Sequence, residues 1–198
     1  MQLYEWSCGS ASVSNALSVF DVHVDERRVI PVAGTTPPSK CAHCMYLKRL
    51  ISARDCLQSY WKCPCDLCKK IRRVWRKDCD AGTSEAGMIE ALRRFGGPKG
   101  VTATEYQTES TSNAWQWLHG SLIHGRVAII CVDSWRHWSL AFGTAGDRVA
   151  VFDPYPSKRN IKSNGIQVLS KVDLMRRWKN TRQWVGKQKA LYAISVGK

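Results

Sequence analysis

Three residues that lie far apart in the sequence have the side chains of a thiol nucleophile, a base and an acid: Cys8, His137 and Asp153. Cys8 stands where a loop enters an expected helix, and the amides and dipole of a helix N-terminus stabilise a thiolate. His137 begins an expected strand, and Asp153 ends the following one, just before Pro154. The order predicts a cysteine nucleophile that His137 activates as base, with Asp153 orienting the imidazole.

Each of these residues also has an ordinary structural interpretation. A lone cysteine is more often an inert buried side chain, and a histidine and a turn aspartate can serve packing alone. Asp133 is a rival candidate for orienting His137, because it stands four residues before it at the end of the preceding strand. We favour Asp153, since adjacent antiparallel strands bring His137 to the far end of the hairpin. Asp133 would have to fold back through the intervening Ser-Trp-Arg.

The elements that must position these side chains follow from the spacing of apolar residues. Helical spacing and capping signals predict helices over 9–20, 84–95, 115–124 and 172–178. Apolar and β-branched runs predict strands over 126–132, 137–143, 148–153, 165–170 and 190–196. Because helices come first and antiparallel strands follow, the order favours an α+β fold.

A cysteine-rich segment interrupts this pattern. Seven of the nine cysteines fall between positions 41 and 79. Cys41-x2-Cys44 and Cys65-x2-Cys68 have the spacing of a four-cysteine zinc site, which predicts one structural zinc ion. We therefore expect residues 40–80 to form an inserted zinc-binding module.

Other arrangements of this segment remain open. Cys63 forms Cys-x-Cys with the second pair and can replace one ligand. Cys56, Cys63, Cys79 and His43 can compose a second zinc site, although their spacing is irregular. A disulfide framework is the alternative to zinc, and it requires an oxidising compartment.

Length and composition set the wider frame. A chain of 198 residues, 44% hydrophobic and 23% charged, fits one globular domain with an insertion. The expected division is 1–39 with 81–198 for the main domain, and 40–80 for the module. No apolar run is long enough to span a bilayer, and the first residues do not resemble a secretory signal. These features predict a cytoplasmic protein.

Positive charge is concentrated in two blocks. The net charge is +14, of which residues 40–80 contribute +7 and residues 158–198 contribute +10. Such blocks often contact nucleic acid, a ribosomal surface, an acidic protein or anionic lipid, although a solvated basic surface is as common. The alternative hypothesis is therefore a non-catalytic or dual-role binding module whose zinc insertion and basic tail contact nucleic acid or a ribosomal surface.

The motifs together resemble those of the papain-like cysteine peptidases that process double-glycine bacteriocin leaders. The resemblance rests on Gln2-x5-Cys8-Gly9, "AGT" at 33–35, "GTSEAGM" at 82–88, His137-Trp138 and Asp153-Pro154. It implies a papain-like fold and a hydrolase that cleaves a peptide or isopeptide bond after small residues such as Gly-Gly. It also implies that the Gln2 side chain, with the Cys8 backbone amide, binds the oxyanion. The cysteine-rich segment is not part of the family pattern.

Overall fold

We describe the protein from a computed structural model, in residues 2–3, 7–35, 82–133, 137–155, 162–178 and 191–198. Apart from Gly82, these residues belong to one compact unit, Met1–Thr35 with Thr83–Lys198. The cysteine-rich module expected at 40–80 lies outside the described residues, and with it every predicted zinc ligand.

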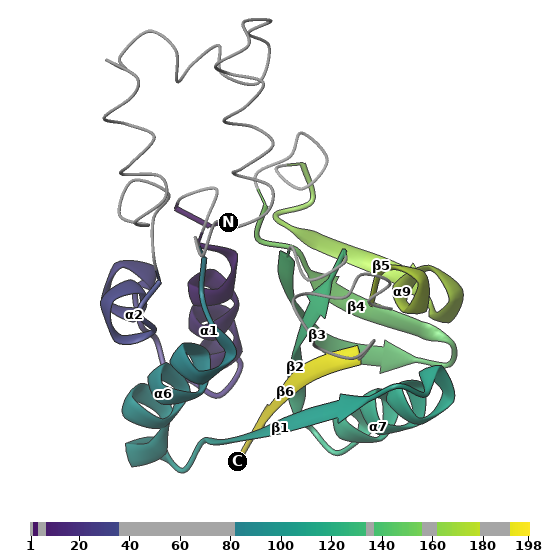
Figure 1. Cartoon of the computed structure of the whole chain (residues 1–198), viewed down its shortest axis with the longest axis horizontal. Coiled ribbons are helices and arrows are strands. Elements are labelled where there is room, and N and C mark those ends of the chain that lie inside the picture. The colour runs from purple at the N-terminus through teal and green to yellow at the C-terminus, as the bar shows by residue number, and fades with distance from the viewer. Residues whose placement is uncertain (1, 4–6, 36–81, 134–136, 156–161, 179–190) are drawn as a thin grey trace, which may run out of the picture. The chain divides into compact units, whose positions relative to one another are not determined.

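The described chain forms a six-stranded antiparallel sheet in the order β1-β6-β2-β3-β4-β5 (Figure 1). The strands are β1 (Thr102–Thr108), β2 (Val127–Val132), β3 (His137–Ala145), β4 (Arg148–Phe152), β5 (Ile166–Ser170) and β6 (Leu191–Gly197). The strand β6 lies between β1 and β2, so the last part of the chain completes the middle of the sheet.

Helices cover both faces of this sheet. Figure 1 shows α1, α2 and α6 on one side and α7 and α9 on the other. Their bounds are α1 (Cys8–Ser18), α2 (Glu26–Val32), α6 (Glu85–Gly96), α7 (Thr111–Ile123) and α9 (Lys171–Trp178), with a short 3-10 helix η1 (Gly97–Lys99) after α6. The combination of helices with an antiparallel sheet confirms the α+β expectation.

The strand β2 shows why the core has two layers. All six of its residues are buried, as expected for a continuous apolar run covered on both faces. Because side chains alternate along a strand, Val127, Ile129 and Cys131 join the cluster beneath α1 and α6, whereas Ala128, Ile130 and Val132 join the cluster beneath α7 and α9. The helix α1 lies against β2 and β3 at the centre of the first cluster.

A network of three hydroxyls joins α1 to the points where the chain leaves and re-enters the described fold. Ser10 Oγ lies 2.5 Å from Thr35 Oγ1, which lies 2.9 Å from Thr83 Oγ1. Gly9 packs so closely here that a Cβ would come within 2.5 Å of the Thr83 Cβ. The ends of the segment between Thr35 and Thr83 are therefore adjacent, at the first turn of α1.

Sequence reasoning missed the helix α2, the strand β1 and the three-residue η1. The helix α2 contains Pro31 and is short, although Asp25 caps it by accepting a hydrogen bond of 2.7 Å from the Arg27 amide. The edge strand β1 has no fully buried residue, so its sequence lacks the apolar run that indicates a strand. The other expected elements are present with their ends shifted by a few residues; the helix expected from Trp115 begins at Thr111, capped by Ser110.

Candidate active site

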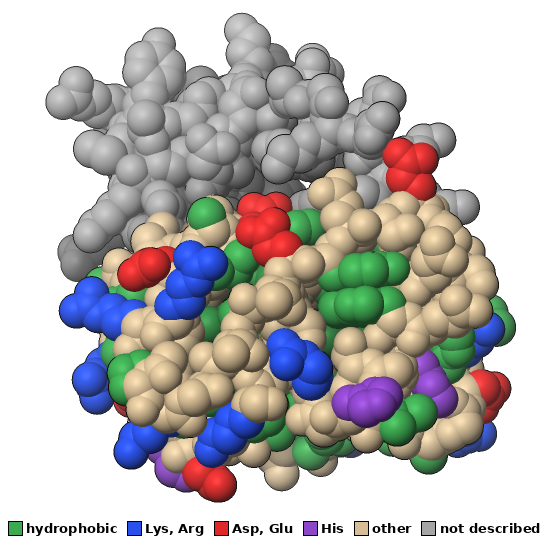
Figure 2. Space-filling model, turned by 90° about the horizontal axis from the view of Figure 1, so that it is seen from below, with side chains coloured by type: hydrophobic (Ala, Val, Ile, Leu, Met, Phe, Trp, Pro, Cys, Tyr) green, Lys and Arg blue, Asp and Glu red, His purple; other side chains and the backbone are tan. Residues whose placement is uncertain are grey.

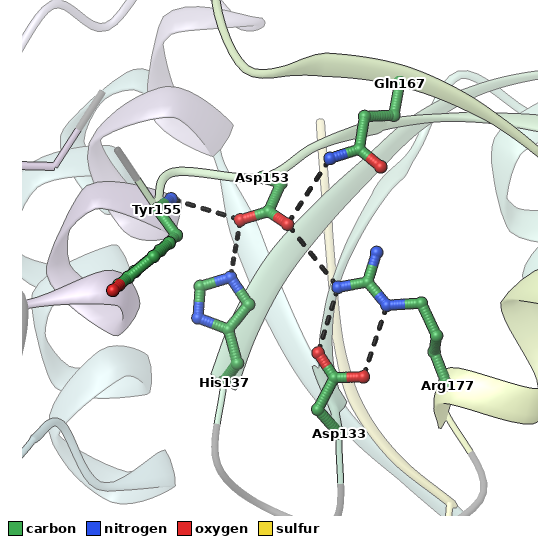
Figure 3. Close-up of polar contacts among 6 residues, drawn as sticks. All are labelled: Asp133, His137, Asp153, Tyr155, Gln167 and Arg177. Carbon is green, nitrogen blue, oxygen red and sulfur yellow. Dashed lines mark hydrogen bonds and ion pairs between the residues drawn. The ribbon is translucent and has the colours of Figure 1, made fainter. Parts of the chain in front are cut away.

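His137 and Asp153 form a buried pair at one end of the β3–β4 hairpin. His137 is the first residue of β3, and Asp153 directly follows β4. The imidazole Nε2 lies 2.7 Å from Asp153 Oδ1 (Figure 3). Only 14% of the His137 side chain and 9% of the Asp153 side chain are exposed. Since an ionised carboxylate can only accept, Nε2–H donates to Oδ1.

Cys8 approaches the same imidazole from the other layer of the structure. It is the first residue of α1, it is a free thiol, and it is 8% exposed. Cys8 is close enough to His137 to raise the pKa of the imidazole. Because Nε2 is bound to Asp153, Nδ1 is the ring nitrogen available to the sulfur. The structure thus brings together the three residues that the sequence singled out first.

The pKa values of the pair move in opposite directions. Burial alone would lower the pKa of His137, but hydrogen bonds to Asp153 and Cys8, and the charges of both, raise it from 6.5 to about 9. Burial alone would raise the pKa of Asp153, but the hydrogen bond and charge of His137, with the Tyr155 amide and Arg177, lower it from 3.8 to about 2. The imidazole is therefore cationic and the carboxylate anionic at neutral pH.

Asp133, the rival for orienting His137, has a different partner. Its carboxylate forms an ion pair with Arg177 of α9, with Nη2 to Oδ2 at 3.0 Å and Nε to Oδ1 at 3.2 Å. Figure 3 shows the guanidinium between the carboxylates of Asp133 and Asp153. Asp133 therefore contacts Arg177, and the carboxylate on the imidazole is that of Asp153.

Gln2 is tied to the strand end that carries Asp153. Its backbone amide donates a hydrogen bond of 2.9 Å to the Pro154 carbonyl, and the residue is 6% exposed. The next amide, of Leu3, donates at 2.9 Å to Glu26 Oε2 of α2. Burial raises the pKa of Glu26, and hydrogen bonds from Ser7 and Leu3 offset only part of that effect. These contacts hold the N-terminal residues beside the hairpin end.

Two further classes of site were expected from the sequence. Within the described ranges no group of three or more His, Cys, Asp or Glu side chains is arranged to hold a metal ion. Most of the two basic blocks lies outside those ranges. On the face of the described residues drawn in Figure 2, Lys and Arg side chains are scattered among neutral and acidic ones. None of the described helices is long and apolar enough to cross a membrane.

Sequence reasoning missed Arg177, Gln167 and Glu26. The carboxylate of Asp153 receives Arg177 Nη2 at 3.4 Å and Gln167 Nε2 at 3.5 Å. Arg177 was one cation among many in a basic stretch, and nothing local reveals that the end of α9 meets the ends of β2 and β4. Glu26 carried a usable signal, because a Glu in the first turn after Asp25 is typical of a helix start.

Comparison with known proteins agrees with this fold. No protein-family model matches the sequence, and no curated protein matches it. Among solved structures, a double glycine motif protease from an AMS/PCAT transporter, in complex with the leader peptide, has a TM-score of 0.51 at 15% identity, over 99% of this chain and 86% of that one. The peptidase domain of Streptococcus ComA, a bifunctional ABC transporter involved in quorum sensing, has a TM-score of 0.51 at 11% identity, over 99% and 93%. The chain is similar in fold to these peptidase domains.

Proposed function

We propose that the protein is a cysteine peptidase with Cys8 as nucleophile. The observation that carries this proposal is the place of His137 between two residues: Asp153, which accepts from Nε2 at 2.7 Å, and Cys8, which raises the pKa of the same imidazole. An imidazole between a thiol and a carboxylate can take the proton of the thiol while the carboxylate orients the ring, as thiol acyl transfer requires. The likeness in fold to peptidase domains supports the same reading.

The expected reaction uses these groups in turn. Transfer of the Cys8 proton to His137 Nδ1 gives a thiolate and the cationic imidazole described above, and the thiolate attacks the carbonyl carbon of the scissile bond. The oxyanion accepts hydrogen bonds from the Cys8 backbone amide and the Gln2 side chain. When the tetrahedral intermediate collapses, the imidazolium gives its proton to the leaving amine and a thioester remains. Water then hydrolyses the thioester with His137 as base, while Asp153 holds the ring throughout.

The substrate we propose is a peptide cleaved after small residues such as Gly-Gly. Two lines support it: the resemblance of the sequence motifs to leader-processing peptidases, and the description of one structural neighbour as a double glycine motif protease that binds a leader peptide. Glycine has no side chain, so a thiolate at a buried helix start can reach its carbonyl with little steric hindrance.

The test is cleavage of peptides containing Gly-Gly, with Ala-Ala and Val-Val in the same frame for comparison, followed by mass spectrometry. Cys8→Ala should abolish cleavage, because it removes the thiol that the proposed reaction places beside His137. Cys131→Ala is the matched control, since Cys131 is the other free buried thiol of the described chain, and this variant should retain activity. Cleavage by Cys8→Ala at the rate of the unaltered protein would refute the proposal.

We also propose that Cys41, Cys44, Cys65 and Cys68 bind one structural zinc ion. The support is their spacing. The purified protein should contain about one zinc per chain by elemental analysis, and Cys65→Ser should lose it. Protein that is free of metal, with these cysteines in disulfides, would contradict this assignment.

A further inference from the structure

The Asp153 carboxylate is held by its two oxygens in different ways. Oδ1 accepts from His137 Nε2 at 2.7 Å and from the Tyr155 amide at 3.1 Å. Oδ2 faces Arg177 Nη2 at 3.4 Å and Gln167 Nε2 at 3.5 Å. A carboxylate can rotate about its bond to Cβ, so a donor on Oδ2 restricts the direction in which Oδ1 points.

Arg177 itself has little freedom. Asp133 binds two nitrogens of its guanidinium, and the Asp133 amide donates 2.8 Å to the Arg177 carbonyl. The next residue, Trp178, is fully buried and donates from Nε1 to the Tyr192 carbonyl at 2.9 Å. A planar guanidinium fixed at one edge presents its remaining donors in a defined direction. That direction is toward Asp153.

Charge gives the same result as geometry. Asp153 is buried beside one imidazole, and a second cation on its far oxygen stabilises its ionised form. Burial would lower the pKa of Arg177, but the hydrogen bond and charge of Asp133, followed by those of Asp153, raise it above its ordinary value. The guanidinium is thus charged at every pH at which His137 and Asp153 form their ion pair.

We propose that Arg177 is a positioning residue, which keeps Asp153 Oδ1 aimed at His137 by holding Oδ2. Its effect on catalysis rests on the peptidase function proposed above, whereas its effect on the imidazole does not. Asp133 anchors the guanidinium. It therefore affects the imidazole indirectly, through Arg177 and Asp153. The end of α9 thereby becomes part of the support of the site.

Arg177→Gln removes the charge and the fork of donors. We expect kcat for a cleaved peptide to fall about tenfold with KM within about twofold, because a displaced base slows chemistry more than binding. Arg177→Lys keeps the charge but has a single ammonium, and it should recover part of the loss. Arg176→Gln is the matched control: Arg176 is the neighbouring residue, its side chain is 76% exposed and forms an ion pair with Asp173 at the surface, and its loss should leave kcat unchanged.

Two further measurements separate positioning from a structural role. In an Asp153→Asn background, Arg177→Gln should lower kcat no further, because its effect passes through Asp153. The downfield proton resonance of His137 Nε2–H should move or broaden in Arg177→Gln and not in Arg176→Gln. This resonance needs no substrate, so it tests the positioning even if no peptide is cleaved. The proposal would be overturned by an unchanged resonance. It would also be overturned if Arg177→Gln lowered kcat by the same factor in the native and the Asp153→Asn backgrounds. If the Gln variant does not fold, Arg177→Lys decides by the same two measurements.

Discussion

Replacing Asp153 by Asn tests how much of the imidazolium charge depends on this carboxylate. The substitution keeps the size of the side chain and removes its charge. In the native protein Asp153 and Cys8 together hold the pKa of His137 at about 9. Because the imidazolium must give its proton to the leaving amine, activity should be present below that pH and be lost as pH rises through it.

The direction of the effect follows from the Asp153 carboxyl. Burial opposes its ionisation, yet its pairing with His137, the Tyr155 amide and Arg177 lowers its pKa from 3.8 to about 2. Part of this change is the interaction with His137, so removal of the carboxylate should lower the pKa of His137 below about 9, while Cys8 continues to raise it. The rate ratio between native protein and variant should then increase as pH rises from 6 towards 9, since the variant loses its imidazolium first.

The assay is kcat/KM for peptide cleavage from pH 5 to pH 10, with the rate of Cys8 alkylation as a measure that needs no substrate. Asp147→Asn is the control, because Asp147 lies exposed in the turn at the other end of β4. Folding stability offers a second check. The raised pKa of His137 contributes stability that is complete below pH 6.5 and lost as pH rises through about 9, and the variant should lack most of it. If kcat/KM falls at the same pH in the variant and in the native protein on the alkaline side of the profile, the reasoning is refuted.

Two further predictions concern packing and burial. Gly87→Ala should unfold or strongly destabilise the protein, because the new Cβ would come within 2.0 Å of the Ala33 carbonyl oxygen. Gly120→Ala in α7, where the space around the residue is open, should instead raise the free energy of unfolding by about 0.5–1 kcal/mol. Thermal denaturation measures both effects. Glu26→Gln should stabilise the protein at pH 7 but not near pH 4, because burial raises the pKa of Glu26 and the Gln side chain keeps an oxygen that accepts from the Leu3 amide. Urea denaturation at the two pH values tests this. An equal change in the free energy of unfolding at both pH values would contradict it.

Much of the site's geometry was within reach of the sequence because it depends on local signals. The position of Cys8 at a helix start follows from the small and apolar residues after it. The meeting of His137 with Asp153 follows from one hairpin, whose register pairs Leu140 with Phe152. Ser84 is the N-cap of α6, and its side chain accepts a hydrogen bond from the Gly87 amide at 3.1 Å. Each inference needs only nearest neighbours along the chain or across one turn.

What the sequence did not predict depends on contacts between distant segments. Arg177 and Asp133 are 44 residues apart, and the pattern of α9 places its apolar residues on the sheet without saying which strand end its last turn reaches. The strand β1 was missed because its stability comes from seven residue pairs with β6, and not from burial of its own side chains. Long-range pairing of this kind leaves no periodicity to detect.

The place of β6 between β1 and β2 has a consequence for the order in which the fold around Cys8 is completed during synthesis. All seven residues of β6 are buried, and they join β1 to β2. Until they emerge from the ribosome, β1 has no partner, and the apolar residues beneath α1 lack Tyr192, Ile194 and Val196. A nascent chain that ends before Leu191 therefore carries Cys8 above an incomplete core. Cys8 is synthesised well before the strand that completes the core beneath its helix.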